Sequence, residues 1–321
     1  MSDEQAVIET EKLTRDFDDT RAVDGLTLSI ETGTLFGLVG PDGAGKTTTL
    51  RLLAGLLDIT AGSAAVAGFD LARDPEAVKA RIGYMAQRFS LYGELTVTEN
   101  LSFFADLYDV PRSELAERRE RLLDFAGLSP FRTRPAEKLS GGMKKKLALA
   151  CTLIHEPPIL LLDEPTTGVD PVSRREFWDI LTELYLEGTT IVVSTPYMDE
   201  ADRCSRVGLM YEGRMIVSDT PQRIRDSVEG DLIEVQTDDW EAARDAAVDF
   251  PGVLEVQTYG ETLHLLVDSA EERLSQVRDR LEDEGIPHRS LRRSAPRMEE
   301  AFISLVRELE RDGARPTQER R

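Results

Sequence analysis

"TLFGLVGPDGAGKTTTLRLL", residues 34–53, joins an apolar run, a glycine-rich loop and a segment with helical spacing. Its residues Gly40–Thr48 match the pattern G-x-x-x-x-G-K-[ST] between a predicted buried strand and a predicted helix, which is where this motif must stand. Gly43 and Gly45 let the backbone curl so that consecutive N–H groups face a phosphate, and the helix N-terminus adds positive potential. We therefore predict a triphosphate site in which Lys46 reaches the β- and γ-phosphates and Thr47 offers its hydroxyl to Mg²⁺.

A second apolar run, "ILLLDEPTTG" at residues 159–168, ends in two carboxylates. It reads as a buried strand, and ligands bind at the carboxyl ends of strands in open parallel sheets. Asp163 is predicted to hold Mg²⁺, and Glu164 to polarise an attacking water as general base. The alternative is that both carboxylates cap the following helix. The phosphate loop upstream favours the metal and base roles.

The stretch "LSGGMKKKLALA", residues 139–150, places a Ser-Gly-Gly turn at the start of a predicted helix. Exposed N–H groups with the helix dipole behind them form an anion-binding site, although an ordinary capped helix has the same pattern. Because the chain already has one phosphate loop, a second one is useful if it covers a nucleotide held by another subunit.

The remaining sequence predicts two domains. Strands alternate with helices up to about residue 225, which indicates an α/β fold with a mostly parallel sheet and helices on both faces. From Asp231 the predicted order is βαββαβ, which is ferredoxin-like. The predicted divisions are residues 1–225 with a helical subdomain at about 91–155, a small α+β domain at 231–310, and a polar, flexible tail at 311–321.

Composition narrows the classes of partner. The 321 residues carry a net charge of −21, which disfavours nonspecific binding to nucleic acid. The acid excess fits either an ordinary soluble surface or adaptation to high intracellular salt. Cys151 and Cys204 match no metal-ligand spacing and are expected to be buried in a reducing compartment. The start "MSDEQAVIETEK" lacks the apolar core of a signal peptide, and no window approaches the roughly 20 apolar residues of a membrane span, so work at a membrane would require a partner.

Taken in order along the chain, these motifs resemble those of an ATP-binding cassette (ABC) ATPase over residues 5 to about 225. Residues 139–178 look like the ATPase subunits of export-type multidrug ABC transporters. The segment from Asp231 to about Glu310, which contains "PRMEEAFISLV", resembles their carboxy-terminal accessory domain. The resemblance implies a P-loop NTPase fold with a helical subdomain, with ATP and Mg²⁺ as cofactors. It rests on Gly40–Thr48, Gln87, Leu139–Met143, Asp163–Glu164, Asp170 and a strand ending at Ser194.

The resemblance also implies a role for each matching residue. Phe17 would stack on adenine, although a single phenylalanine is more often a core residue than a platform for a base. Gln87 would contact Mg²⁺ and link the site to a membrane subunit. Ser140 and Gly142 would reach the γ-phosphate of ATP on an opposite cassette, and Asp170 would communicate across that interface. Met143 replaces the commoner glutamine.

The complete prediction is a set of three overlapping groups. The catalytic residues are Glu164, Gln87 and Lys46. The metal ligands are Thr47, Gln87 and Asp163. The nucleotide-binding residues are Phe17, Gly40, Pro41, Asp42, Gly43, Ala44, Gly45, Lys46, Thr47, Thr48, Ser140, Gly141, Gly142 and Asp170.

The function implied is the energising subunit of a membrane exporter for drugs or similar amphiphiles. Its partners would be an integral membrane permease, contacted through about Leu91–Leu128, and a second cassette, and it would work at the cytoplasmic face of the membrane. Two alternatives are a soluble ABC ATPase and a regulatory module that uses ATP only to dimerise. A single cassette and the acid excess disfavour the first, and Lys46, Asp163 and Glu164 disfavour the second. The carboxy-terminal domain would aid dimerisation, regulate the cassettes or act as a passive brace.

One position departs from the family pattern. In "VSTPYMDEAD", Pro196 stands where these ATPases normally carry a histidine that touches the γ-phosphate. Proline has no side-chain donor, so slow hydrolysis is predicted at this site. Either the chain pairs with a different cassette that holds the active site, or it forms a homodimer with slow hydrolysis driven by Glu164.

Pro196→His is expected to raise turnover, because a missing charge-assisted donor in a transition-state site costs roughly 3 kcal/mol, or about a hundredfold in rate. The measurement is the ATPase rate of the assembled transporter. An unchanged rate would contradict the explanation.

Overall fold

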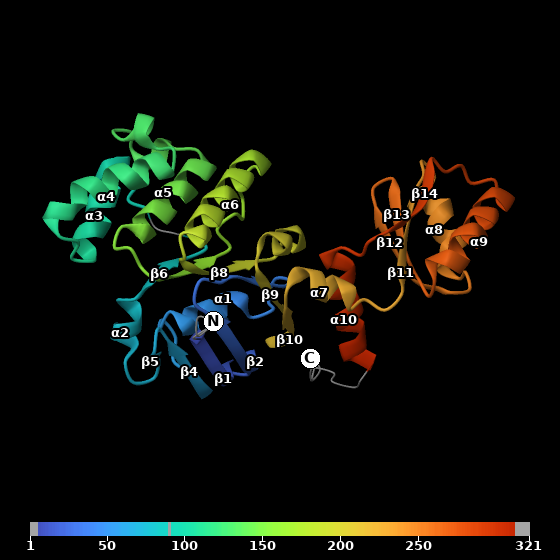
Figure 1. Cartoon of the computed structure of the whole chain (residues 1–321), viewed down its shortest axis with the longest axis horizontal. Helices are drawn as coiled ribbons and strands as arrows, with labels where there is room; N and C mark the ends of the chain where they lie inside the picture. Colours follow the sequence, from blue (N-terminus) through green and yellow to red (C-terminus); the bar gives the residue numbers. More distant parts are fainter. Residues whose placement is uncertain (1–5, 89–90, 312–321) are drawn as a thin grey trace. The chain divides into compact units, whose positions relative to one another are not determined.

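The structure is a computed structural model that describes residues 6–88 and 91–311 (Figure 1). The chain divides into two compact units, Met1–Pro221 and Gln222–Arg321, and each is described by itself. The predicted tail lies outside the described residues beyond Arg311. Within the described part of the chain, no helix combines the length and the apolar character needed to cross a bilayer.

The first unit is built on a six-stranded sheet with the order β10-β9-β3-β8-β7-β6. All neighbouring strands from β9 to β6 pair in parallel, and only β10 is antiparallel, on its neighbour β9. Every residue of β3, β7 and β8 is buried, as expected for central strands with both faces covered. The strands are β3 (Leu35–Val39), β6 (Ile82–Met85), β7 (Ile159–Asp163), β8 (Thr190–Thr195), β9 (Arg206–Tyr211) and β10 (Arg214–Asp219).

An antiparallel sheet with the order β2-β1-β4-β5 packs on the same core. Alternate residues of its long strands are buried, so one face meets the core and the other meets water. Phe36 and Leu38 of β3 share a cluster with Ile8 and Leu13 of β1. The strands are β1 (Ala6–Phe17), β2 (Thr20–Glu31), β4 (Ala61–Val66) and β5 (Phe69–Asp70).

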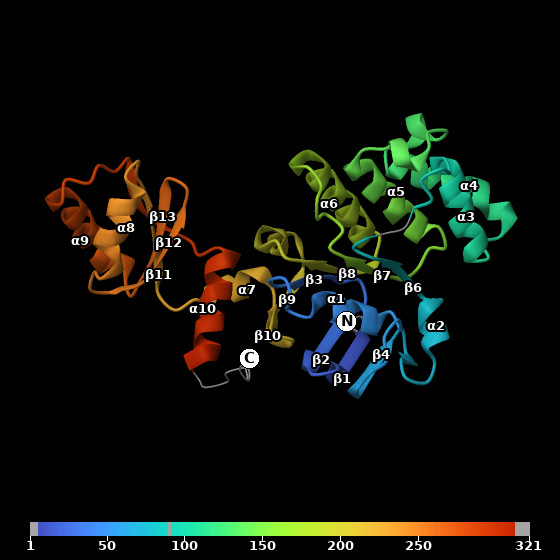
Figure 2. The ribbon, with the colours of Figure 1, turned by 180° about the vertical axis from the view of Figure 1, so that it is seen from behind.

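Helices cover both faces of the parallel sheet. Figures 1 and 2 show α5 and α6 on one face, and α1 with the antiparallel sheet on the other. Helices α3 to α5 gather beside α6, and α3 begins at a capping box formed by Thr96 and Glu99. The prediction of an α/β fold with a mostly parallel sheet is confirmed. The helices are α1 (Lys46–Leu53), α2 (Pro75–Lys79), α3 (Val97–Leu107), α4 (Arg112–Phe125), α5 (Gly141–Leu153) and α6 (Pro171–Leu186), with 3₁₀ turns at Ser129–Phe131, Ala136–Lys138 and Met198–Arg203.

The second unit has a four-stranded antiparallel sheet with the order β12-β13-β11-β14. Its elements follow the βαββαβ order that the sequence predicts for a ferredoxin-like unit. Apolar side chains of β11 and β13 form one core with α8 and α9. The elements are α7 (Pro221–Asp226), β11 (Asp231–Gln236), α8 (Trp240–Val248), β12 (Val253–Tyr259), β13 (Thr262–Val267), α9 (Ala270–Asp283), β14 (Ser290–Ser294) and α10 (Met298–Arg311).

A buried hydrogen bond joins α10 to this sheet. His264 Nδ1 of β13 donates to Glu300 Oε1 of α10 at 2.5 Å, and both side chains are almost fully buried. Burial alone would raise the pKa of Glu300, but hydrogen bonds from His264 and from the Arg297 N–H outweigh it and hold that pKa below its usual value. The first turn of α10 is therefore fixed by hydrogen bonds as well as by packing.

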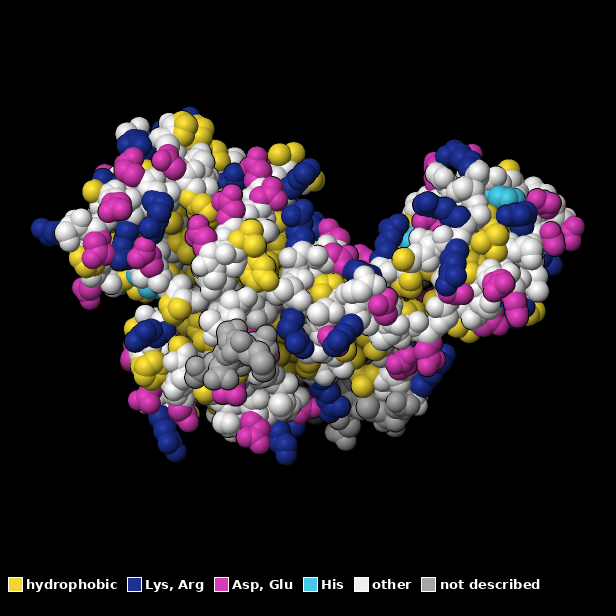
Figure 3. All heavy atoms as spheres, viewed as in Figure 1, with side chains coloured by type: hydrophobic (Ala, Val, Ile, Leu, Met, Phe, Trp, Pro, Cys, Tyr) yellow, Lys and Arg dark blue, Asp and Glu magenta, His cyan; other side chains and the backbone are white. Residues whose placement is uncertain are grey.

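Side chains of both charges cover the surface. On the face drawn in Figure 3, Asp and Glu side chains are interspersed with Lys and Arg over both units. Cys151 and Cys204 are both free and buried, as the sequence predicts.

Leu265→Ala is expected to destabilise the second unit by about 2–5 kcal/mol, because a buried leucine leaves both lost transfer energy and a cavity. Leu265 is 1% exposed. Hydrogen exchange of peptides from residues 231–294, in the full chain, reports the free energy of opening. Leu254→Ala is the matched control, since that leucine is 53% exposed. An equal loss in both variants would contradict the assigned core.

Candidate nucleotide-binding site

The glycine-rich loop connects β3 to α1, as predicted, and its backbone leaves no room for side chains at two positions. Gly45 is the N-cap of α1 with φ 97°, and a Cβ there would lie 2.4 Å from the Ala22 carbonyl oxygen. A Cβ on Gly40 would lie 2.2 Å from the Met210 carbonyl oxygen. The Gly40 N–H donates to the Thr195 carbonyl at 3.3 Å, which ties the loop to the end of β8. Glycine is therefore required sterically at both ends of the loop.

The Lys46 side chain folds back onto the loop and bonds its carbonyl oxygens. Its ammonium donates to the carbonyl oxygens of Gly40 at 2.8 Å and Pro41 at 2.9 Å, and it lies 3.7 Å from Glu164 Oε1. The side chain is 3% exposed. Burial lowers the pKa of Lys46, and the nearby carboxylate of Glu164 offsets part of that shift. The loop thus holds a fixed cation where an anion can enter.

Asp163 lies at the carboxyl end of β7 and is fully buried. Its Oδ1 accepts from the hydroxyls of Thr47 and Ser194, each at 2.8 Å. Its Oδ2 is buried without a hydrogen-bond partner among the described residues. A carboxylate oxygen in that position is costly unless a cation or donor reaches it.

These groups fit Mg²⁺, because a hydroxyl and a carboxylate are the oxygen ligands that this ion takes beside phosphates and water. Within residues 6–88 and 91–311, this site included, no three His, Cys, Asp or Glu side chains are grouped so that they could hold a metal. At this site the ion would have few protein ligands, as is usual for Mg²⁺ at a nucleotide.

Glu164 meets both Lys46 and Gln87. Its Oε2 accepts from Gln87 Nε2 at 2.7 Å and from the Thr167 hydroxyl at 3.2 Å. Its backbone is left-handed, with φ 45°, and its N–H donates to the Ser194 hydroxyl at 3.0 Å. The alternative that Asp163 and Glu164 cap a helix is wrong, because the next helix, α6, begins at Pro171 with Asp170 as its N-cap.

The Ser-Gly-Gly turn begins α5, and its contacts run to α6 rather than to the loop. The Ser140 hydroxyl accepts from the Met143 N–H at 3.3 Å, which makes it the N-cap. A Cβ on Gly142 would lie 2.4 Å from the Ser173 hydroxyl oxygen, so the starts of α5 and α6 pack closely there. Gly141 is exposed, and the first N–H groups of a helix have no partner within it. The turn is therefore both a capped helix start and a surface that can receive an anion.

Asp170 belongs to the same neighbourhood. Its carboxylate accepts from the N–H groups of Val172 at 3.1 Å and Ser173 at 3.0 Å. Hydrogen bonds from Ser173, chiefly from its N–H, hold the pKa of Asp170 below its usual value. Its contact in a single chain is thus with α6.

Phe17 is 39% exposed at the end of β1, so the alternative that it is a core residue is wrong. The Arg15 guanidinium lies over its ring, 4.6 Å from the centroid.

Pro196 directly follows β8, half-buried beside Tyr197. The Arg174 guanidinium lies over the Tyr197 ring, 4.5 Å from its centroid, and pairs with Asp199 and Glu200. The Tyr197 ring is therefore in contact with an arginine that is itself paired with two carboxylates.

Two contacts in the site were not predicted. Thr167 donates to Glu164, and the Lys145 ammonium donates to the Gln87 carbonyl at 3.0 Å. Burial lowers the pKa of Lys145, and the charges of Asp163 and Glu164 oppose that shift. The only signal in the sequence was the lysine triplet Lys144–Lys146, which does not say which lysine points inward.

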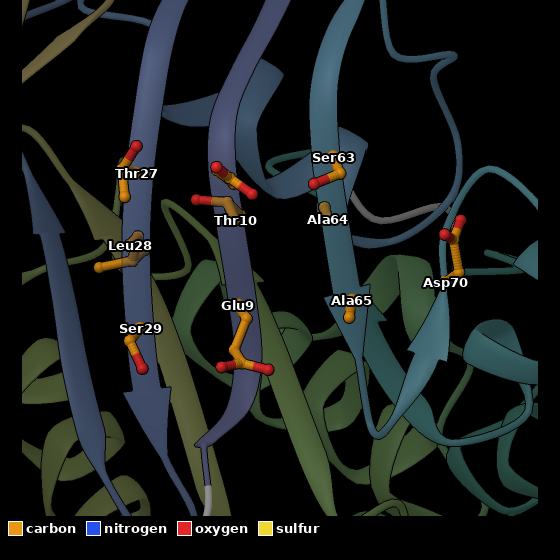
Figure 4. Close-up of a pocket in the computed structure, with 10 residues that line it drawn as sticks. Glu9, Thr10, Thr27, Leu28, Ser29, Ser63, Ala64, Ala65 and Asp70 are labelled. Atoms are coloured by element: carbon orange, nitrogen blue, oxygen red, sulfur yellow. The ribbon is translucent and has the colours of Figure 1, made fainter.

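A separate hollow of about 500 Å³ lies on the water-facing side of the antiparallel sheet (Figure 4). Glu9, Thr27, Ser29 and Ser63 line it from three neighbouring strands. It shares no residue with the loop or with the carboxylates of β7, so it is no part of the nucleotide site.

Comparison with known proteins places this geometry in context. A family model described as ABC transporter matches residues 23–167. The chain is 44% identical over 291 residues to the probable multidrug ABC transporter ATP-binding protein YbhF of Escherichia coli (strain K12), a match that covers 90% of this chain and 50% of that protein. It thus spans about half the length of this relative.

Two further matches cover nearly all of the compared protein. The daunorubicin resistance ATP-binding protein DrrA2 of Streptomyces coeruleorubidus is 36% identical, and the match covers 93% of this chain and 94% of that one. The solved structure of cbiO1 from Clostridium perfringens, part of the ABC transporter complex cbiONQ, has a TM-score of 0.65 at 28% identity and covers 77% of this chain and 97% of that one.

Ser194→Ala is expected to lower the free energy of unfolding by about 1–3 kcal/mol, since Asp163 and Glu164 lose a hydroxyl partner. Affinity for Mg²⁺–nucleotide should fall by about tenfold or more, because Asp163 is no longer oriented. Calorimetric titration with and without Mg²⁺ measures this. Ser205→Ala is the control, because its hydroxyl makes a similar pair of bonds to the Leu35 backbone away from the site. Equal nucleotide affinities in the two variants would contradict the assignment.

Proposed function

Because the chain belongs to the ABC transporter family, as an ATP-binding subunit, we propose that it hydrolyses ATP to drive export through a membrane permease. The observation that carries this proposal is the meeting of Lys46, Thr47, Gln87, Asp163 and Glu164 at the carboxyl edge of one parallel sheet. Ligands bind at that edge in sheets of this kind.

The residues divide the chemistry among them. Mg²⁺, when bound, neutralises charge on the phosphate oxygens. Thr47 and Asp163 would hold it, and Lys46 would exchange its bonds to the loop carbonyls for bonds to the β- and γ-phosphates. The loop N–H groups that follow Pro41 would cradle the phosphates, and Phe17 would stack on adenine.

Glu164 is the general base in this proposal. Its carboxylate can accept a proton from water positioned near the γ-phosphate, and such a base contributes about 10²–10⁴-fold in rate. Gln87 donates to this carboxylate through its Nε2. The Oε1 of Gln87 is then left to bind a cation. One amide side chain would thus orient both the base and the metal.

Within one chain, the Ser-Gly-Gly turn makes its contacts with α6 and not with the glycine-rich loop. The proposal therefore includes a second cassette, from a copy of this chain or from a different chain. The Ser-Gly-Gly turn of that cassette would cover the nucleotide held by this chain, and Ser140–Gly142 of this chain would cover the nucleotide held by the second cassette. ATP would bind the closed pair more tightly than the open pair, and hydrolysis would reopen it.

The other partners follow from the same family membership. The permease would lie in the membrane, with this chain at its cytoplasmic face and α3 and α4 toward it. The two relatives are named for multidrug transport and daunorubicin resistance, which supports drugs or similar amphiphiles as cargo. The second unit would support or regulate the pairing of cassettes.

Pro196 favours one alternative, a module that binds ATP but hydrolyses it little. In that case nucleotide would drive pairing, and another cassette would supply turnover. Purification of the tagged full chain from native membranes, followed by mass spectrometry, identifies the permease and shows whether a second, unlike cassette accompanies it.

Glu164→Gln is the decisive variant for hydrolysis. It should retain Mg²⁺–ATP and lose about a hundredfold or more in turnover, because the amide cannot accept the proton. Nucleotide binding and phosphate release are measured on the same full-chain sample. Glu183→Gln, at an exposed position on α6, is the control.

The full chain without detectable ATP binding would contradict the whole proposal. A Glu164→Gln variant that hydrolyses ATP like the unaltered chain would contradict the assigned base alone.

A further inference from the structure

Two adjacent lysines of α5 make different contacts. Lys146 pairs with Glu176 of α6 at 2.6 Å, which joins two helices away from the carboxylates of β7. Lys145 instead reaches the segment after β6, where its ammonium donates to the Gln87 carbonyl at 3.0 Å. An ammonium donor makes this hydrogen bond stronger than one between neutral groups.

The Gln87 backbone lies outside the strand ladder. Strand β6 ends at Met85, and within the described residues Gln87 makes no hydrogen bond to another backbone group. Gln87 is also exposed. Among residues 6–88 and 91–311, the hydrogen bond to its carbonyl comes from Lys145.

The side chain of Gln87 points to the base. Its Nε2 donates to Glu164 Oε2 at 2.7 Å, so the residue is held at its carbonyl by Lys145 and at its amide by Glu164. These bonds form a continuous connection from helix α5, through Gln87, to the carboxylate that removes the proton.

We propose that Lys145 is a positioning residue for hydrolysis, which holds the Gln87 peptide so that the Gln87 amide orients Glu164. The proposal rests on the proposed ATPase function and assigns Lys145 no contact with nucleotide. A displacement of α5 is passed to the base through this lysine. The neighbouring Lys146 has no such role.

Lys145→Met tests the bond, because methionine keeps most of the apolar stem and lacks the donor. Turnover should fall about tenfold, while the KM for ATP stays within about twofold, because the phosphates are still held by the loop and Lys46. Lys145→Arg, which retains a charged donor, should recover most of the rate. Lys146→Met is the matched control and should keep the rate of the unaltered chain.

The combination with Gln87→Ala tests the route. If Lys145 acts through Gln87, then Lys145→Met should change turnover by less than about twofold in the Gln87→Ala background. An equal loss in both backgrounds would overturn the proposal, and so would unchanged turnover in Lys145→Met. Lys145→Leu, which is shorter and also lacks a donor, is the second variant if Lys145→Met does not fold.

A measurement without nucleotide separates this proposal from the proposed function. The carbonyl ¹³C chemical shift of Gln87, measured by NMR on the full chain without ATP, should change in Lys145→Met and stay the same in Lys146→Met, because only the first variant removes the donor to that carbonyl. An equal shift in Lys145→Met and the unaltered chain would overturn the proposal even if the chain is an ATPase. A changed shift in a chain that never hydrolyses ATP would support the contact and reject the function.

Discussion

The buried carboxylate of Asp163 determines how the site is assembled. It stands at the end of a central strand, fully enclosed, and a charge in that position requires partners. Thr47 comes from the first turn of α1 and Ser194 from β8, so three segments far apart in sequence meet at one oxygen. Displacing α1, β7 or β8 would remove a hydrogen bond from this carboxylate. The position of the glycine-rich loop therefore depends on buried contacts in the core as well as on the surface.

The net charge of the chain does not predict the local charge at this site. The protein carries −21 overall, yet Lys46 and Lys145 both lie close enough to Asp163 and Glu164 for their pKa values to respond to those carboxylates. Burial disfavours each cation, and the carboxylates compensate in part. A polyphosphate would enter a region where fixed cations and helix N–H groups are already oriented, so little reorganisation accompanies binding. Local arrangement, rather than net charge, sets the chemistry here.

Much of this arrangement could be predicted from sequence because its signals are local. The strand–loop–helix context of Gly40–Thr48, the apolar run that ends at Asp163, and the βαββαβ order after Asp231 each depend on neighbouring residues alone. Lys145 could not be singled out, because which of three consecutive lysines reaches Gln87 depends on the rotation of α5 against another segment. The exposure of Phe17 and the hydrogen bond from the Thr167 hydroxyl to Glu164 also depend on tertiary packing, which the local sequence does not show. The role of Asp170 as the cap of α6 does have a local signal, because an aspartate before a proline is typical of a helix start, although the predicted role came from the family resemblance instead.

The backbone of Glu164 carries a further consequence. A left-handed φ of 45° is unfavourable for any residue with a side chain, and such strain costs on the order of 1–3 kcal/mol. Glycine at this place would relax the strain, yet it would also remove the carboxylate that lies beside the buried Lys46 ammonium, and an unpaired buried cation costs stability in turn. The contacts of the carboxylate with Lys46, Gln87 and Thr167 thus oppose the strain of the backbone that carries it. Any substitution at this one peptide unit would change both quantities at once, so its effect on the melting temperature would not report the strain alone.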